Sequence, residues 1–335
     1  MLATPDISVI IPAKDEEESI PELCQWISRV MKTHGFSYEV IIIDDGSVDG
    51  TWKQIQQVSA EDDRFKGIRF NRNFGKSAAL QTGFRASRGK VIITMDADLQ
   101  DSPDEIPELY RMIFTDGYHL VSGWKKVRHD PVTKTLPSKF FNRITRIISG
   151  IKLNDFNCGL KAYQDIVVKN INVYGEMHRY IPVIAKWAGF TRIGEKVVQH
   201  NHRKYGRTKF GWTRMTGLLD VLSITFVGRF GRKPMHLFGS LGIMSFLVGF
   251  IFTVKLFYDK IKSLYFDHIP MKRDITEQPV FYLALVALII GVQLFLTGFL
   301  AELFAMQTVA RRDYLVIDRV GFDQQQKNLR GVDVP

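Results

Sequence analysis

Two aspartates separated by one residue, Asp96 and Asp98, are the residues whose types and spacing most directly indicate chemistry. They follow an apolar segment at 90–95. In extended backbone their side chains would point to opposite faces, whereas a turn can direct both toward one ion. Oxygen ligands without His or Cys suit Mg²⁺ or Mn²⁺, which leave coordination positions for water and phosphate oxygens. The pattern predicts a divalent cation that holds a diphosphate; the alternative is a helix cap or turn without a ligand.

Acidic and polar residues also follow two other apolar segments, at 12–16 and 44–47. Ligands of open parallel α/β sheets bind at the carboxyl ends of the strands, so we expect the three ends to form one site. A dinucleotide-binding fold would place a GxGxxG pattern after the first strand, and none stands there. A phosphate loop of the GxxxxGKS type is also excluded, because Phe70 stands where its first glycine is required.

The three acidic ends belong to a regular alternation of apolar and amphipathic stretches. Short β-branched runs predict buried strands, and the amphipathic stretches between them predict helices. Such an alternation indicates a mostly parallel sheet covered by helices on both faces. The expected strands are 7–11, 39–43, 67–70 and 90–95, and the expected helices run from the acidic cluster at 15–18 to residue 31, onward from residue 51, and over 76–86.

The 335 residues exceed what one hydrophobic core usually serves, which indicates a large domain with an additional part. With 45% hydrophobic and 24% charged residues, the chain is neither disordered nor of low complexity. Its two cysteines, Cys24 and Cys158, have no CxxC spacing and no nearby His/Cys cluster. Neither a disulfide framework nor a structural zinc site is supported, and a reducing compartment fits best.

The net charge of +10 is compatible with nucleic acid, a membrane surface or an anionic substrate. Its position favours a membrane, because eight basic residues and one acid lie between 203 and 233, directly before apolar sequence. Two segments, 236–258 and 280–304, are apolar on all faces and reach the about 20 residues that a span requires. The alternative is a pair of buried helices in a soluble core. Residues 209–232 predict interfacial amphipathic helices.

Basic residues before the first span and after the second predict that both termini are cytoplasmic, by the positive-inside rule. The N-terminus shows neither the basic region nor the cleavage site of a secretory signal. We therefore expect an integral protein of the inner, cytoplasmic membrane. The predicted parts are a cytoplasmic catalytic domain at 1–205, amphipathic helices at 206–234, two transmembrane helices within 235–310 with an extracytoplasmic loop near 259–279, and a cytoplasmic tail at 311–335.

Longer runs of sequence resemble a known family. The runs SVIIPAKDEEESI, VIIIDDGSVDGT, RNFGKSAALQTGF and VIITMDADLQDSPDEIPEL are similar to family 2 glycosyltransferases, whose catalytic fold is called GT-A. The later runs DFNCGLKAY, HRYIP and YGRTKFG, followed by two spans, resemble the polyprenyl-phosphate glycosyltransferases, which include dolichyl-phosphate mannose synthases and bacterial enzymes acting on undecaprenyl phosphate. The resemblance implies a Rossmann-like α/β GT-A domain followed by interfacial and transmembrane helices.

For the sugar donor, the resemblance implies a nucleoside pocket beside a site for metal and diphosphate. The metal, Mg²⁺ or Mn²⁺, would be held by Asp96, Asp98 and Gln100. The pair His178 and Arg179 matches a family motif whose role is either structural or catalytic. The implied nucleotide-sugar-binding residues are Pro12, Asp15, Glu16, Asp45, Lys76 and Asp96. The alternatives are a plain turn for Asp45, an exposed polar loop for Lys76 and a solvated position for Gln100.

For the acceptor, the resemblance implies a set of phosphate-binding residues and three catalytic ones. The catalytic set is Asp98, Asp155 and Arg128. The acceptor-phosphate set is Lys125, Arg128, Ser138, Asn142, Lys161, Arg203, Arg207 and Lys209. Lys125 stands where many relatives have arginine, and lysine lacks the bidentate phosphate geometry. For the three basic residues nearest the membrane, the alternative is contact with lipid headgroups.

The implied reaction moves a sugar from a nucleotide diphosphate to a polyprenyl phosphate and inverts the anomeric carbon. The nucleophile is already anionic, because the second pKa of a phosphate monoester is about 6, so no strong general base is required. Undecaprenyl phosphate is preferred over dolichyl phosphate by resemblance, and a homo-oligomer stays open.

The sequence disfavours three other functions. A processive polysaccharide synthase would need a QxxRW motif and enough helices for a channel, and the sequence has neither. An inactive nucleotide-sugar-binding scaffold is disfavoured by the intact aspartate pair at Asp96 and Asp98. A nucleic-acid binder is disfavoured because the basic stretch adjoins a membrane span, so no nucleic-acid partner is expected.

Overall fold

The structure, a computed structural model, describes residues 4–126, 142–143, 145–147, 149–202, 204–205, 234–266 and 274–309. The chain divides into two compact units, residues 1–228 and 229–335. The division falls within the basic stretch that precedes the first apolar segment.

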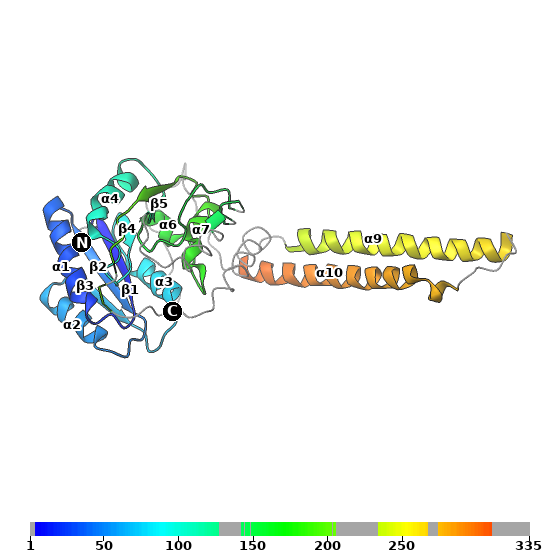
Figure 1. The fold of residues 1–335 in the computed structure, drawn as a ribbon, viewed down its shortest axis with the longest axis horizontal. Helices are drawn as coiled ribbons and strands as arrows, with labels where there is room; N and C mark the ends of the chain where they lie inside the picture. The colour runs from blue at the N-terminus through cyan, green and yellow to red at the C-terminus, as the bar shows by residue number, and fades with distance from the viewer. Residues whose placement is uncertain are drawn as a thin grey trace, which may run out of the picture. The chain divides into compact units, whose positions relative to one another are not determined.

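One sheet organises the first unit (Figure 1), and the strands among the described residues follow the order β3-β2-β1-β4-β6-β5-β7. They are β1 (Ile7–Ala13), β2 (Tyr38–Asp44), β3 (Phe65–Arg69), β4 (Val91–Thr94), β5 (Leu120–Trp124), β6 (Lys161–Gln164) and β7 (Ile193–Val197). Only β6 runs antiparallel to its neighbours, β4 and β5. The other pairings are parallel, which confirms the predicted, mostly parallel sheet.

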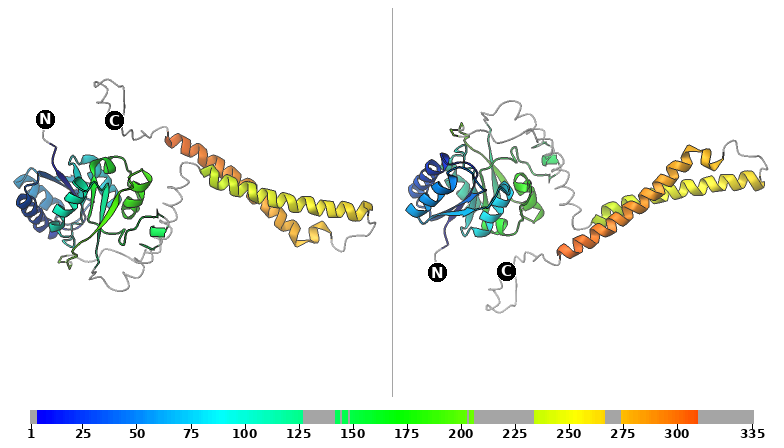
Figure 2. Two further views of the ribbon diagram at one scale, coloured as in Figure 1. Left: turned by 90° about the horizontal axis from the view of Figure 1, so that it is seen from above. Right: turned by 90° about the horizontal axis from the view of Figure 1, so that it is seen from below.

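Helices cover both faces of this sheet (Figure 2). They are α1 (Ser19–His34), α2 (Thr51–Glu61), α3 (Lys76–Ala86), α4 (Ile106–Phe114), α6 (Asp165–Lys169) and α7 (Ile181–Trp187), with the 3₁₀ helices η1 (Pro103–Glu105) and η2 (Met177–Tyr180). Alternate strand residues point to opposite faces. Val9 and Ile11 of β1 therefore pack in one core with α1, α2 and α4, while Ile10 packs in a second core with α3, α6 and α7.

The register of the central strands brings the predicted site together. Ala13 at the end of β1 pairs with Asp44 at the end of β2, and Ile10 of β1 pairs with Thr94 at the end of β4. Because these three strands are parallel, their carboxyl ends meet at one edge of the sheet. The loops that carry the three acidic clusters begin at this edge.

The second unit contains two long apolar helices, α9 (Pro234–Ile261) and α10 (Pro279–Val309), with the short π-helix η4 (Lys262–Phe266) and the 3₁₀ helix η5 (Ile275–Glu277). The stretches Pro234–Phe266 and Pro279–Phe304 are long and apolar enough to cross a membrane, and only 17% of each apolar window is buried within the structure. A core helix of a soluble protein would be mostly buried. The low burial therefore favours the transmembrane alternative.

Glycines allow the backbones of α9 and α10 to approach closely. A Cβ atom at Gly242 would lie 2.8 Å from the carbonyl oxygen of Gly291, and one at Gly249 would lie 2.7 Å from that of Ala284. The contacts move backward along α10 as they advance along α9, so the two helices form an antiparallel hairpin. Small residues of this kind are the usual means by which helices pack in lipid.

Candidate active site

The residues after β4 form a tight turn at the carboxyl edge of the sheet. The Oδ1 atom of Asp98 accepts a hydrogen bond from the backbone N–H of Gln100 at 3.2 Å. Leu99 lies between them with φ of 61°, in the left-handed region that non-glycine residues rarely adopt, and its side chain is buried. Strained backbone of this kind gathers at functional sites. The turn holds two of the predicted metal ligands next to each other.

A fully buried carboxylate, that of Asp101, holds this turn in place. Its Oδ2 atom accepts the backbone N–H of Asp96 at 3.2 Å, and its Oδ1 atom forms an ion pair with the Nζ atom of Lys125 at 2.8 Å. Backbone pairing between Asp101 and His200 ties the same point to the chain after β7. Burial alone would lower the pKa of Lys125, but Asp101 raises it, so this ammonium stays charged.

Lys76, the first residue of α3, forms an ion pair with Asp96 through its ammonium group. Both side chains are 32% exposed, so the pair faces an opening rather than the core. Burial alone would raise the pKa of Asp96, but Lys76 and then Lys125 lower it to about 2. The other carboxylate oxygen packs against Gly159, where a Cβ atom would lie 2.5 Å away. Asp96 is thus an ionised carboxylate in a confined position.

A third lysine, Lys161 of β6, adds positive charge near Asp96. Its side chain is 3% exposed, and its ammonium donates to the carbonyl oxygen of Cys158. Burial lowers the pKa of Lys161. The three lysines come from the start of α3, the residue after β5 and the start of β6. The sheet therefore assembles a cationic group that no local sequence pattern contains.

The predicted nucleoside-binding residues lie in and after β1. Pro12 is half-buried within the strand. Asp15 has φ of 48°, and together with Leu99 it makes up the non-glycine residues with positive φ in the described part of the chain. Its Oδ1 atom accepts the backbone N–H of Val48 at 2.9 Å, which joins the loops after β1 and β2. The carboxylate of Glu16 accepts the hydroxyl of Ser19 at the start of α1 at 3.0 Å. Both strained residues thus flank the same edge of the sheet.

Asp45, also predicted to bind the nucleoside, holds the loop before α3. Its carboxylate accepts the backbone N–H groups of Phe74 at 2.7 Å and Gly75 at 3.0 Å. The adjacent Gly46 has φ of 67°, and a Cβ atom there would lie 2.5 Å from the backbone carbon of Arg72. Only glycine fits this turn. In this structure Asp45 positions the start of α3, and its contact with a base or ribose stays a prediction.

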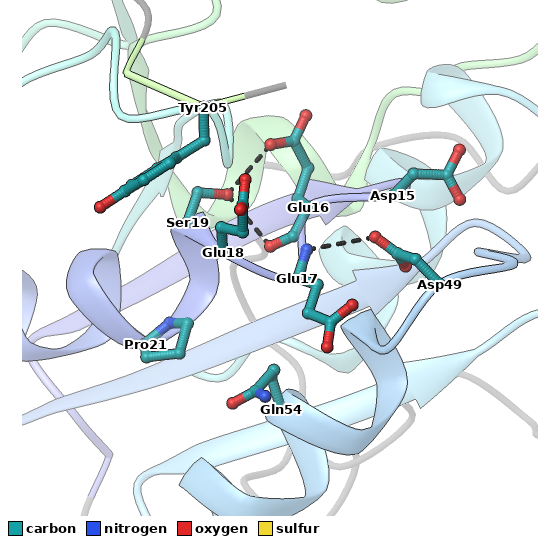
Figure 3. A pocket seen from close by; sticks show the side chains of 9 residues that line it. All are labelled: Asp15, Glu16, Glu17, Glu18, Ser19, Pro21, Asp49, Gln54 and Tyr205. Atoms are coloured by element: carbon teal, nitrogen blue, oxygen red, sulfur yellow. Dashed lines mark hydrogen bonds between the residues drawn. The ribbon is translucent and has the colours of Figure 1, made fainter. Parts of the chain in front are cut away.

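A pocket of about 700 Å³ lies between the starts of α1 and α2 (Figure 3). Its lining includes the ring of Tyr205 and the carboxylates of Asp15, Glu16, Glu17, Glu18 and Asp49. A concentration of negative charge repels phosphate groups. We therefore expect the diphosphate of a nucleotide at the lysine side of the site rather than in this pocket.

The described acceptor-side residues converge on the segment that contains Asp155. Asp155 is 1% exposed, and its Oδ1 atom accepts the backbone N–H of Asn157 at 3.0 Å. Asn142 donates from its side-chain amide to the carbonyl oxygen of Asn154 at 2.9 Å. Glu195 of β7 accepts the backbone N–H groups of Asn154 at 2.6 Å and Asp155 at 3.0 Å. These contacts bring Asn142 and Asp155 to one loop, with Glu195 as its clamp.

His178 packs against the start of α3. Its Nδ1 atom lies 3.1 Å from the hydroxyl oxygen of Ser77, and its backbone N–H donates to the same oxygen at 3.0 Å. Burial first, and then the charges of Lys76 and Arg179, lower the pKa of His178 to about 2. His178 thus holds the start of α3, and the role of the pair in catalysis stays a prediction.

Five predicted site residues lie outside the described residues, so their roles stay predictions. They are Arg128, Ser138, Arg203, Arg207 and Lys209.

The structure also adds three residues that sequence reasoning did not assign to the site, namely Ser77, Asp101 and Glu195. Asp101 carried a local signal, as a third carboxylate in the run DADLQD. Ser77 and Glu195 carried none, because they meet partners 101 and 40 residues away.

The chemistry of the donor set after β4 fits a hard divalent cation. Asp96, Asp98 and Gln100 offer only oxygen atoms, and Asp96 already carries a cation in the form of the Lys76 ammonium. Within the described residues, no group of three His, Cys, Asp or Glu side chains gathers as a metal site. A cation at this turn would meet two carboxylates and an amide, with water or phosphate oxygens completing its coordination.

Comparison with known proteins gives a consistent match. The sequence profile described as "Glycosyl transferase family 2" matches residues 8–171. The chain is similar to the dodecaprenyl-phosphate galacturonate synthase of Rhizobium johnstonii, with 35% identity over 96% of this chain and 94% of that protein. It is also similar to the undecaprenyl-phosphate 4-deoxy-4-formamido-L-arabinose transferase of Shewanella sediminis, with 35% identity over 75% of this chain and 76% of that protein.

Solved structures share the fold of the first unit. Crystal structures of glucosyl-3-phosphoglycerate synthase from Mycobacterium tuberculosis match with 20% identity. The complex with UDP has a TM-score of 0.52 and covers 66% of this chain and 80% of that one. The complex of the same enzyme with Mn²⁺, UDP-glucose and phosphoglyceric acid has a TM-score of 0.53, with the same coverage.

Proposed function

This chain belongs to glycosyl transferase family 2, among its polyprenyl-phosphate glycosyltransferases, and we propose that it moves a sugar from a nucleotide-diphosphate sugar to a polyprenyl phosphate. Direct displacement by the acceptor phosphate inverts the anomeric carbon, as fits the family. Undecaprenyl phosphate is the acceptor we favour over dolichyl phosphate, because the two relatives are named for undecaprenyl phosphate and dodecaprenyl phosphate.

One observation carries the proposal: three lysines gather near Asp96 at the carboxyl edge of the sheet. Lys76 pairs with Asp96 itself, and Lys125 pairs with Asp101, which accepts the backbone N–H of Asp96. Lys161 donates to the carbonyl oxygen of Cys158, beside the glycine that packs against Asp96. The reaction brings a diphosphate and a phosphate monoester together, and their mutual repulsion is its main difficulty. Positive charge in a partly enclosed site offsets this repulsion and stabilises the departing nucleoside diphosphate.

A divalent cation is the second part of the proposal. Asp96, Asp98 and Gln100 would hold Mg²⁺ or Mn²⁺, which when bound supplies charge neutralisation for the departing diphosphate. The turn at Leu99 supports this assignment, because it holds Asp98 and Gln100 together through the N–H of Gln100. Pro12, Asp15, Glu16 and Asp45 would contact the nucleoside.

On the acceptor side, we propose that Asp155, Lys161 and Asn142 position the phosphate of the lipid, together with Lys125. Asp101 keeps Lys125 protonated and fixed through its ion pair. Glu195 holds the loop of Asp155 from β7. Arg128, Ser138, Arg203, Arg207 and Lys209 complete this set by their sequence positions.

We also propose that α9 and α10 anchor the enzyme in the inner membrane, with the catalytic unit and both termini in the cytoplasm. Residues 203–233 are rich in Lys and Arg, and positive flanks remain on the cytoplasmic side. The side chains of α9 and α10 are largely exposed in the structure and apolar, so lipid is the solvent that suits them.

The test is direct transfer. Membranes containing the full chain would be incubated with undecaprenyl phosphate and a panel of labelled nucleotide sugars that includes activated galacturonate and 4-deoxy-4-formamido-L-arabinose. Extraction and chromatography would identify any charged lipid. Asp98→Ala should abolish the product while membrane insertion persists. Full turnover by Asp98→Ala would contradict the metal assignment, and nucleotide-sugar binding without any lipid product across the panel would favour the inactive scaffold.

A further inference from the structure

The ammonium of Lys76 pairs with Asp96, the same carboxylate that would bind the divalent cation under the proposed function. The ion pair with Asp96 joins Lys76 to one of the three predicted metal ligands. Two cations that share one carboxylate oxygen repel each other strongly, and more so in a confined site than in water. The ion pair and a bound divalent ion therefore compete for Asp96.

Lys76 differs from the other two lysines in its freedom to move. Its side chain is 32% exposed, whereas that of Lys125 is 13% exposed and held by Asp101 at 2.8 Å. Lys161 is buried, and its ammonium is bound to a backbone carbonyl. A lysine at the first position of a helix, on a flexible four-carbon stem, can leave its partner without disturbing the fold.

Hydrogen bonds hold the backbone on both sides of Lys76, while its partly exposed side chain is held by the ion pair with Asp96. Asp45 holds the N–H groups of Phe74 and Gly75, and the Ser77 hydroxyl is bonded to His178. The side-chain torsions of Lys76 therefore allow its ammonium to move while its Cα atom stays in place. A diphosphate offers more negative charge than one carboxylate, and it would approach from the open side on which the pair is exposed.

We propose, resting on the function above, that the ammonium of Lys76 takes the place of the divalent cation at Asp96 in the free enzyme. When the donor binds, this stand-in cation transfers to the diphosphate of the donor. The divalent cation and the donor therefore bind cooperatively. Lys76 is thus a positioning residue for the metal ligand and a binding residue for the donor. By linkage, any factor by which the donor improves cation affinity is the factor by which the cation improves donor affinity.

The test measures Mn²⁺ binding by electron paramagnetic resonance, with the full chain in detergent and no nucleotide present. Lys76→Met should bind Mn²⁺ about tenfold more tightly than the wild type, within the range usual for coupled sites. Lys76→Arg keeps a cation and should bind like the wild type. Lys125→Met removes a neighbouring charge that does not touch Asp96, and it should change Mn²⁺ affinity less than Lys76→Met does.

A second arm adds saturating UDP as the probe for a nucleoside diphosphate. Mn²⁺ affinity should rise more steeply with UDP in the wild type than in Lys76→Met. If Lys76→Met binds Mn²⁺ no more tightly than the wild type, Lys76 is a diphosphate ligand only and the stand-in role is wrong, while the proposed function remains. If the wild type binds no Mn²⁺ with or without UDP, the metal site of the proposed function fails as well. Thermal melting confirms that each variant is folded.

Discussion

Replacing Asp101 by asparagine should reveal how strongly the buried ion pair holds the active-site turn. Asparagine keeps the shape of Asp101 and can still accept the N–H of Asp96, but it removes the charge that faces Lys125. Asp101 is fully buried and Lys125 is 13% exposed, so the lysine would be left as a poorly solvated, unpaired cation. Breaking a buried pair from one side costs about 3–5 kcal/mol, and the partial exposure of Lys125 favours about 3.

For a unit of this size, about 3 kcal/mol corresponds to a fall of about 6–12 °C in melting temperature. The assay is thermal unfolding of the full chain in detergent, followed by tryptophan fluorescence. Asp116→Asn is the matched control, because it breaks an exposed pair with Arg111 that is worth about 0–1 kcal/mol. The double variant Asp101→Asn with Lys125→Met removes the stranded charge and should recover much of the loss. If Asp101→Asn and Asp116→Asn have the same melting temperature, the ion pair between Asp101 and Lys125 does not stabilise the turn.

Two other variants test the fold around the site and in the hairpin. The pKa of His178 is lowered to about 2, so the unfolded chain binds a proton that the folded chain does not, and stability should fall as pH drops below 6.5. Each pH unit lowers the free energy of unfolding by about 1.4 kcal/mol, so the melting temperature of His178→Gln should depend less on pH between 6.5 and 5 than that of the wild type. Identical slopes of melting temperature against pH in the two proteins would contradict the buried neutral imidazole. A Cβ atom at Gly291 would lie 2.7 Å from the backbone nitrogen of Phe246, so Gly291→Leu should push α9 and α10 apart. Distances between spin labels on the two helices would measure the separation. Val292→Leu, a change at a 46% exposed position, is the control. An unchanged distance in Gly291→Leu would refute the close packing.

Much of the architecture follows from local pattern, because a strand buried on both faces must be apolar throughout. The predicted segments 7–11 and 39–43 lie within β1 and β2, and the helix expected over 76–86 has the same bounds as α3. The position of β6 could not be predicted. Its four residues, Lys161–Gln164, carry no distinctive periodicity, and they insert antiparallel between β4 and β5 through long-range pairing.

Some residues of the candidate site could likewise be predicted from local sequence, and others could not. Asp96 and Asp98 are recognisable because their spacing is local and they follow a strand. The pairing of Asp101 with Lys125 depends on β5 lying near the end of β4, which only the folded sheet determines. For Asp45, the sequence position indicates a contact with the ligand, whereas in the structure its carboxylate holds the backbone before α3.

The close contact of α9 and α10 limits what the hairpin can do for the enzyme. With the backbone of Gly242 against that of Gly291, and Gly249 against Ala284, the space between the helices is filled by the chain itself. A polar head group has no space between the two backbones where these small residues meet. We therefore expect the described hairpin to anchor the catalytic unit rather than to line a route for the head group.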